Sequence, residues 1–208
     1  MDNDARLEFL SARVQSLVRE KEAALAALES ASRLGHFDTS YAALDGPEPI
    51  LDEIAARAAE LLPMPAAAVY LIDEASQDVA LAHRRGAADG FDPEAEIDAL
   101  INDHSFAFAL GRRGPTFFEA VTARGRLLLH PLATPSRVRG MFVGLVHGPA
   151  GEATDTALAL LTVVLNAGAQ ALESFALYRH MRGVNAVLEE TVAARTAELR
   201  QAYDQVRL

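Results

Sequence analysis

Apolar positions near both ends of the chain recur at alternating steps of three and four residues. In the first segment, from about Asp4 to Leu34, no proline or glycine interrupts a stretch rich in Ala, Leu, Glu and Arg, all of which favour a helix. We predict one long helix there, with a stripe that faces a partner helix as in a coiled coil. The alternative is a helix packed on its own domain. Lys21 interrupts the stripe, which otherwise consists of Leu7, Leu10, Val14, Leu17, Ala24, Leu28 and Ala31.

The last segment has the same spacing and predicts a second long helix. From Asp155 onwards, closely spaced apolar residues predict a helix that packs on the rest of the protein. Gly183 need not end this helix, because glycine costs only about 1 kcal/mol relative to alanine. Since Leu208 still lies within the pattern, we expect that the natural protein continues or that the chain ends within a linker. The later stripe has one irregular step, after Leu188, and consists of Leu177, Met181, Val184, Leu188, Val192, Arg195, Leu199, Ala202 and Val206.

The middle of the chain alternates between short apolar runs and helical spacing, as a mixed domain does. Residues 50–62 have one apolar face and predict a helix, and residues 94–110 predict another. In residues 141–146 both alternating sets of side chains are apolar, which predicts a central strand covered on both faces. The second helix offers Ile97, Leu100, Ile101, Phe106 and Phe108 for burial. The predicted strands are residues 66–72, 79–83, 116–118, 127–132 and 137–147.

These elements together predict an α/β (α+β) fold. A central antiparallel sheet of about five or six strands would be covered by helices and flanked by the long terminal helices. The chain then divides into three parts. Residues 1–46 form an N-terminal coiled-coil helix with its connection, residues 47–177 form the mixed domain, and residues 178–208 form the C-terminal helix.

Charge and cysteine content exclude several classes of function. The chain of 208 residues carries a formal net charge of −10, which disfavours nucleic acid and anionic membrane surfaces as partners. It contains no cysteine, so disulfides, thiolate metal sites, cysteine nucleophiles and thioether-linked chromophores are excluded. The N-terminus lacks the features of a signal peptide, and we find no apolar run long enough to span a bilayer. We therefore predict a cytoplasmic protein.

Three consecutive pieces of the mixed domain carry a family resemblance. Leu129-His130-Pro131-Leu132 is followed by Arg137-Val138-Arg139-Gly140 and then by Met141-Phe142-Val143-Gly144-Leu145-Val146. This order is similar to the late strand pair of the GAF family of sensory domains, in which an apolar-Pro-Leu strand, a short turn and a Gly-apolar strand follow one another. The stretch from Ile50 to Ile72 is similar to the family's opening helix and first strand. The resemblance covers about residues 47–177, and PAS domains share much of this arrangement.

The resemblance implies a cavity on one face of the sheet, which in various GAF domains holds cyclic nucleotides, haem, bilins or other small molecules. The chain has no cysteine to attach a bilin, and it lacks the Asn-Lys-Phe-Asp-Glu signature of members that bind cyclic nucleotides. The ligand and any cofactor therefore stay unknown. The residues that we expect to border such a cavity are aromatic or polar-tipped, and each has the alternative of being an ordinary core or rim residue. They are Tyr70, His83, Phe106, Phe117 and His130.

Residues 188–199 resemble the signalling helix that joins sensory domains to histidine kinases or diguanylate cyclases. The two resemblances imply a cytoplasmic sensory domain of a signal-transduction protein, with a histidine kinase as the first choice. Such a domain would bind a small effector and transmit the signal through helices that pair in a homodimer. The alternative is a dimerising scaffold that binds no ligand and whose pocket is filled by its own Phe and Leu side chains.

An enzymatic function is the least favoured of the hypotheses. A sulfoxide reductase, a chemistry known in a few GAF relatives, depends on cysteine thiols that this chain lacks. The sequence contains no phosphate-binding Gly-rich loop, no His-Glu-x-x-His zinc helix and no Gly-x-Ser-x-Gly elbow. We therefore predict a regulatory domain with no catalytic residues and no metal site.

Overall fold

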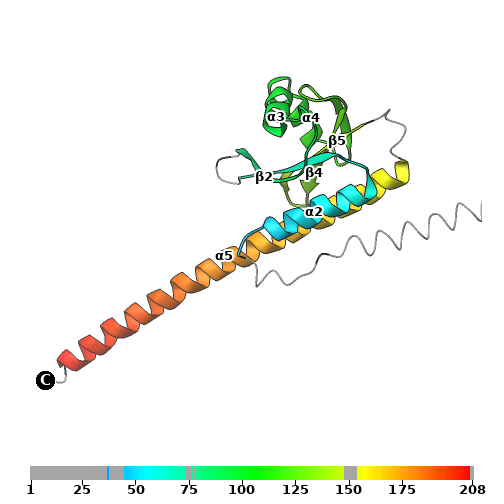
Figure 1. The fold of residues 1–208 in the computed structure, drawn as a ribbon. Helices are drawn as coiled ribbons and strands as arrows, with labels where there is room; N and C mark the ends of the chain where they lie inside the picture. The colour runs from blue at the N-terminus through cyan, green and yellow to red at the C-terminus, as the bar shows by residue number, and fades with distance from the viewer. Residues whose placement is uncertain (1–36, 38–44, 74–75, 77, 148–153, 207–208) are drawn as a thin grey trace, which may run out of the picture.

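A five-stranded antiparallel sheet forms the centre of the computed structural model, which describes residues 37, 45–73, 76, 78–147 and 154–206 (Figure 1). The strand order is β2-β1-β5-β4-β3, and every neighbouring pair is antiparallel. The α+β fold and the antiparallel sheet predicted from the sequence are therefore confirmed. The strands are β1 (Ala66–Ile72), β2 (Val79–Gly86), β3 (Thr116–Glu119), β4 (Arg126–Ala133) and β5 (Val138–Val146).

Strand β5 occupies the middle of the sheet, as its doubly apolar pattern predicts. Its residues from Gly140 to Leu145 are all buried, because helices cover both faces of the sheet at this strand. Gly140 is required by the close approach of the neighbouring strand: a Cβ at this position would lie 2.0 Å from the backbone oxygen of Tyr70 in β1.

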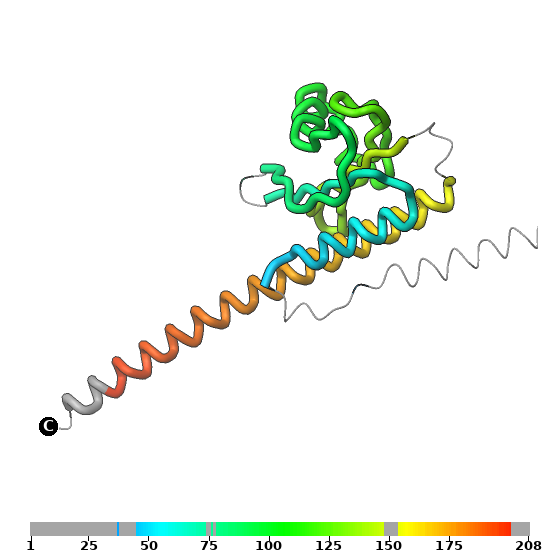
Figure 2. Tube along the Cα trace, in the orientation of Figure 1, coloured from blue at the N-terminus to red at the C-terminus, as the bar shows by residue number. Residues whose placement is uncertain are grey.

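Two pairs of helices cover the two faces of the sheet (Figures 1 and 2). Helices α2 (Glu48–Leu61) and α5 (Asp155–Val206) lie side by side on one face, and α3 (Pro93–Asn102) and α4 (Ser105–Leu110) lie on the other. Each face has its own core. The core on the α2/α5 face includes Leu51, Ile54, Val69, Leu128, Leu132, Phe142, Leu161 and Leu165. The core on the α3/α4 face includes Tyr70, Phe91, Ile97, Leu100, Phe106, Leu127, Leu129, Met141, Val143 and Leu145.

Helices α3 and α4 replace the single helix predicted over residues 94–110, and that prediction is wrong at its centre. His104 adopts a left-handed backbone with φ of 66°, and the side chain of Asp103 accepts a hydrogen bond from the Ser105 amide at 2.9 Å. A short acidic side chain that bonds to the following backbone competes with the helical hydrogen bonds. After this break Phe106 and Ala109 face the core. Ile101 and Phe108 are 43% and 52% exposed, whereas the sequence analysis expected both to be available for burial.

Helix α5 is continuous over 52 residues and passes Gly183 without a break, as predicted. Its first part packs on the sheet, whereas the part after Phe175 extends far beyond the domain (Figure 1). By length and composition alone, Asp155–Arg200 is apolar enough to cross a membrane, contrary to our sequence-based expectation. Within the most apolar window of this helix, 44% of the residues are buried inside the protein.

The predicted N-terminal helix over residues 4–34 lies outside the described residues. Phe37 is described and is buried in the core on the α2/α5 face, where the guanidinium of Arg57 lies 4.5 Å from its ring centroid.

Candidate functional site

The five residues predicted to border a ligand cavity lie on both faces of the sheet. Tyr70 and Phe106 belong to the core on the α3/α4 face. Phe117 packs against the core on the α2/α5 face, His83 approaches Asp52 of α2, and His130 approaches Thr162 of α5. The structure therefore does not bring the five residues together around one cavity.

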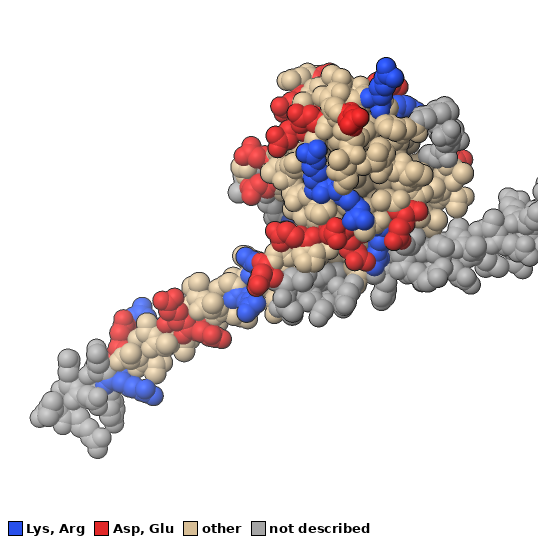
Figure 3. Space-filling view, in the orientation of Figure 1, with Lys and Arg blue, Asp and Glu red and all other residues tan. Residues whose placement is uncertain are grey.

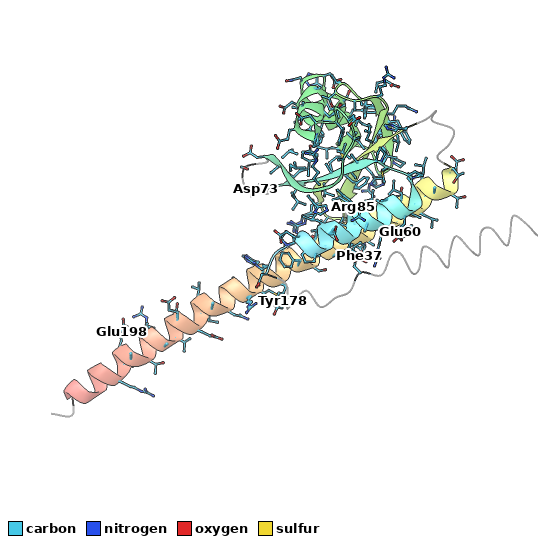
Figure 4. All side chains as sticks on the ribbon, viewed as in Figure 1. Phe37, Glu60, Asp73, Arg85, Tyr178 and Glu198 are labelled. Atoms are coloured by element: carbon cyan, nitrogen blue, oxygen red, sulfur yellow. The ribbon has the colours of Figure 1, made fainter. Side chains whose placement is uncertain are left out.

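The α3/α4 face is filled by side chains of the protein itself. The Tyr70 hydroxyl donates a hydrogen bond to the Pro93 carbonyl oxygen at 2.6 Å, which ties β1 to the start of α3. Burial, followed by the nearby carboxylates of Glu94 and Asp92, raises the pKa of Tyr70 above its usual range, so this phenol stays a neutral donor. Phe106 is only 4% exposed. Figure 4 shows side chains crowded between the sheet and these two helices.

Glu96 of α3 is a buried carboxylate that the sequence analysis did not single out. It is fully buried and accepts hydrogen bonds from the backbone amides of Val121 and Thr122 at 2.9 and 2.6 Å. It also accepts one from the Thr122 hydroxyl at 2.5 Å. The carboxylate thereby fixes the loop between β3 and β4 against α3. Its position one turn before Leu100, on the buried face of the helix, is the sequence signal that would have indicated this role.

His130 of β4 is a buried histidine, 1% exposed, with partners at both ring nitrogens. Nδ1 lies 2.8 Å from the Pro131 carbonyl oxygen, and Nε2 lies 3.2 Å from the Thr162 hydroxyl. Because a carbonyl only accepts hydrogen bonds, we assign the proton of the neutral ring to Nδ1. The Thr162 hydroxyl can donate its single hydrogen either to the unprotonated Nε2 or to the Leu158 carbonyl oxygen, which lies 2.9 Å away. Burial lowers the pKa of His130 to about 4. The ring is therefore neutral at physiological pH, and binding a haem or metal would break one of these contacts.

His83 and Phe117 occupy more ordinary positions. The His83 Nε2 atom lies 3.6 Å from Asp52 Oδ1, which is also 3.3 Å from the Arg85 guanidinium. The guanidinium of Arg126 stacks over the Phe117 ring, 4.9 Å from its centroid. Both side chains have protein neighbours, and the buried Nε2 atom of His83 has no hydrogen-bond partner among the described residues.

Two of the cavities that the described residues form lie between α5 and the rest of the domain, and the sequence analysis predicted neither. A small one of about 170 Å³ lies beside β4, and His130 forms part of its wall. A larger one of about 510 Å³ lies where α5 leaves the domain, between Leu71, Phe175 and Arg179. There Arg179 donates a hydrogen bond to the Asp45 carbonyl oxygen at 2.5 Å. Among the residues described in the structure, no three His, Asp or Glu side chains are grouped so that they could hold a metal ion.

The family of the chain follows from its sequence match. A family model of the GAF domain matches residues 47–174, which is more than half of the chain. The chain belongs to the GAF domain family. The GAF domain so defined contains the whole sheet, α2, α3, α4, the first part of α5 and all five predicted site residues.

Several solved GAF domains are similar to this one in structure. A GAF domain assigned to a sensor histidine kinase of Pseudomonas syringae pv. tomato is 18% identical, covers 85% of this chain and 98% of its own, and has a TM-score of 0.48. The second GAF domain of DevS from Mycobacterium smegmatis is 20% identical, with coverages of 65% and 99% and a TM-score of 0.48. The GAF domain/HD domain protein from Geobacter sulfurreducens is 16% identical, with coverages of 66% and 98% and a TM-score of 0.49. No curated protein sequence matches the chain.

Proposed function

We propose that this chain is a regulatory GAF module of a cytoplasmic signalling protein, in first place a histidine kinase, and that helix α5 is its output. The observation that carries this proposal is that one unbroken helix belongs both to the core and to the extension. Leu161, Leu165 and Leu172 are buried against the sheet and α2. The same helix then runs out of the domain, with Tyr178 at the point of exit and Glu198 far along it (Figure 4). A rearrangement of the core would therefore move the extension.

The extension carries an apolar stripe that has no cover among the described residues. Six of its large side chains are between 52% and 71% exposed: Leu177, Met181, Val184, Leu188, Val192 and Leu199. Outside this stripe the surface mixes acidic and basic groups. Figure 3 shows such a mixture on the visible face of α2 and of α5. A long exposed stripe at this spacing is the pattern that a partner helix covers in a coiled coil. A second copy of α5 is the partner that we propose.

The proposed homodimer can be tested by a charge within the stripe. In the Leu199→Glu variant each helix would place a carboxylate in the seam, opposite its copy, so we expect the dissociation constant of the dimer to rise more than tenfold. Sedimentation equilibrium measures this constant. Ala197→Glu is the matched control, because Ala197 is exposed and lies on the opposite side of the helix. Equal dissociation constants for both variants and the parent chain would remove the stripe from the dimer contact.

A GAF scaffold that binds no ligand on the α3/α4 face is favoured by a separate observation. Tyr70, Phe106, Leu127 and Leu129 fill the space between the sheet and these helices and are at most 4% exposed. This filling supports the scaffold hypothesis for that face. A small effector would then have to bind elsewhere on the domain.

A further inference from the structure

The short edge strand β3 leaves one end of β4 uncovered. β3 pairs with β4 only as far as the contact between Thr116 and Leu129, so β4 has no strand on that side from His130 to Ala133. Pro131 lies in this stretch, and a proline without an N–H group suits an open strand edge. The cavity of about 170 Å³ lies here, between the edge of β4, the loop that carries Arg113, and the side chains of Asn166 and Gln170 on α5.

The wall of this cavity is rich in hydrogen-bond donors. We infer that it binds a small monocarboxylate, with the guanidinium of Arg113 as the counter-ion and the amides of Asn166 and Gln170 as further donors. Arg113 forms no ion pair or hydrogen bond with any residue that the structure describes. Guanidinium is the group that best matches a carboxylate, because two of its N–H groups reach both oxygens.

The charges around the cavity fit a single anionic group. No carboxylate lines the cavity. The nearest acid along α5 is Glu173, which lies 3.2 Å from the Arg137 guanidinium and accepts a hydrogen bond from Ser136 at 3.0 Å. Its charge is thus already compensated. His130, which lines the cavity, has partners at both nitrogens and is neutral because burial lowers its pKa, so Arg113 supplies the net charge of the site.

The volume of the cavity limits the size of the ligand. A volume of about 170 Å³ corresponds to roughly six water molecules at about 30 Å³ each. It therefore accommodates an acid of two to four carbons, such as a hydroxy or keto acid whose second polar group meets an amide. Nucleotides, haem and bilins are too large for it.

The position of the cavity connects such a ligand to α5. Asn166 and Gln170 are residues of α5, and Thr162 on the same helix bonds to His130. A bound carboxylate would link this helix to the loop that carries Arg113. A change in how two extensions pair when the cavity is occupied is a further step, and this step rests on the proposed function. It requires the carboxylate to bind with different affinities to the two arrangements of the paired helices.

The test is a titration of the isotope-labelled chain with pyruvate, followed by NMR. We expect saturable shifts at Arg113, Asn166 and Gln170, with a dissociation constant on the order of 1 mM. Arg113→Gln should weaken binding at least tenfold. Arg112→Gln is the matched control, because the Arg112 guanidinium lies outside the cavity and stacks over Phe108, 4.8 Å from the ring centroid. The affinity of this variant for pyruvate should equal that of the parent chain.

The inference would be overturned if no shift occurred up to ~50 mM pyruvate, which is 50-fold the expected dissociation constant. Equal affinity in Arg113→Gln, or shifts confined to the α3/α4 face, would also overturn it. Inorganic phosphate is titrated in parallel, and tighter binding of phosphate than of pyruvate would contradict the assignment to a carboxylate. Should Arg113→Gln fail to fold, Gln170→Leu, at an exposed position, provides the second variant. The mass of the chain by light scattering is recorded separately, so loss of binding and loss of the dimer are distinguishable.

Discussion

Replacement of Glu96 by alanine is expected to lower the free energy of unfolding by about 4 kcal/mol. The substitution removes the acceptor of the backbone amides of Val121 and Thr122, and a hydrogen bond to a charged group contributes about 1.5–3 kcal/mol. It also removes side-chain volume at a position that is fully buried. Urea-induced unfolding at a fixed protein concentration measures the change.

Two further variants separate the role of Glu96 from a general sensitivity of α3. Glu94→Ala removes an exposed carboxylate from the same helix and should change stability by less than about 0.5 kcal/mol. Thr122→Val removes one hydroxyl but keeps both backbone donors, and about 1 kcal/mol is expected. If Glu96→Ala were no more destabilising than Glu94→Ala, the carboxylate would not be what fixes the loop.

The second large effect is a loss of stability in acid that depends on His130. Its pKa is about 4 in the folded protein, whereas the unfolded chain has the ordinary value of about 6.5. Above about pH 6.5 both states are neutral and no stability is lost. As the pH falls from about 6.5 to 4, only the unfolded state takes up the proton. The folded state should thereby lose about 3 kcal/mol, and the loss is complete below pH 4.

His130→Asn isolates this contribution from other titrating groups. Asparagine can still donate a hydrogen bond to the Pro131 carbonyl oxygen, but it does not titrate in this range. The variant is less stable at pH 7, and its deficit relative to the parent should shrink by about 3 kcal/mol at pH 4. His147→Asn, at an exposed position, serves as the control. A deficit that stays constant between pH 7 and pH 4 would contradict the neutral, buried state of His130.

The sequence pattern predicted the helices and strands better than it predicted the contacts between side chains. The central position of β5 followed from apolar residues on both of its faces, and the continuity of α5 followed from the absence of a stop signal. The break at Asp103 and His104 was missed, because it depends on one side-chain hydrogen bond to Ser105 rather than on the spacing of apolar residues. Local competition of this kind changes no hydrophobic pattern.

The candidate site was predicted less well for a related reason. Alternation along one strand predicts which of its residues share a face of the sheet. It does not predict which residues of the neighbouring strand lie on that same face. That depends on register, which pairs Tyr70 with Met141 and Phe117 with Leu128 and so separates the two aromatic residues. The Arg112-Arg113 pair was interpreted as a solvated face, with an anion at a pocket mouth as the alternative. The sequence could not place Arg113 at a cavity, because Asn166 and Gln170 lie more than 50 positions further along the chain.

The pairing of two α5 helices through their apolar stripe is tested most directly by single cysteines. The chain has no cysteine of its own, so an introduced thiol reacts only with its copy. In a parallel pair, residues of the seam face each other at a separation that suits a disulfide. We predict that Val192→Cys forms a covalent dimer under mild oxidation, whereas Ala197→Cys, on the opposite side of the helix, stays monomeric on a non-reducing gel. Equal cross-linking of the two variants, or none with either, would contradict a dimer formed through this stripe.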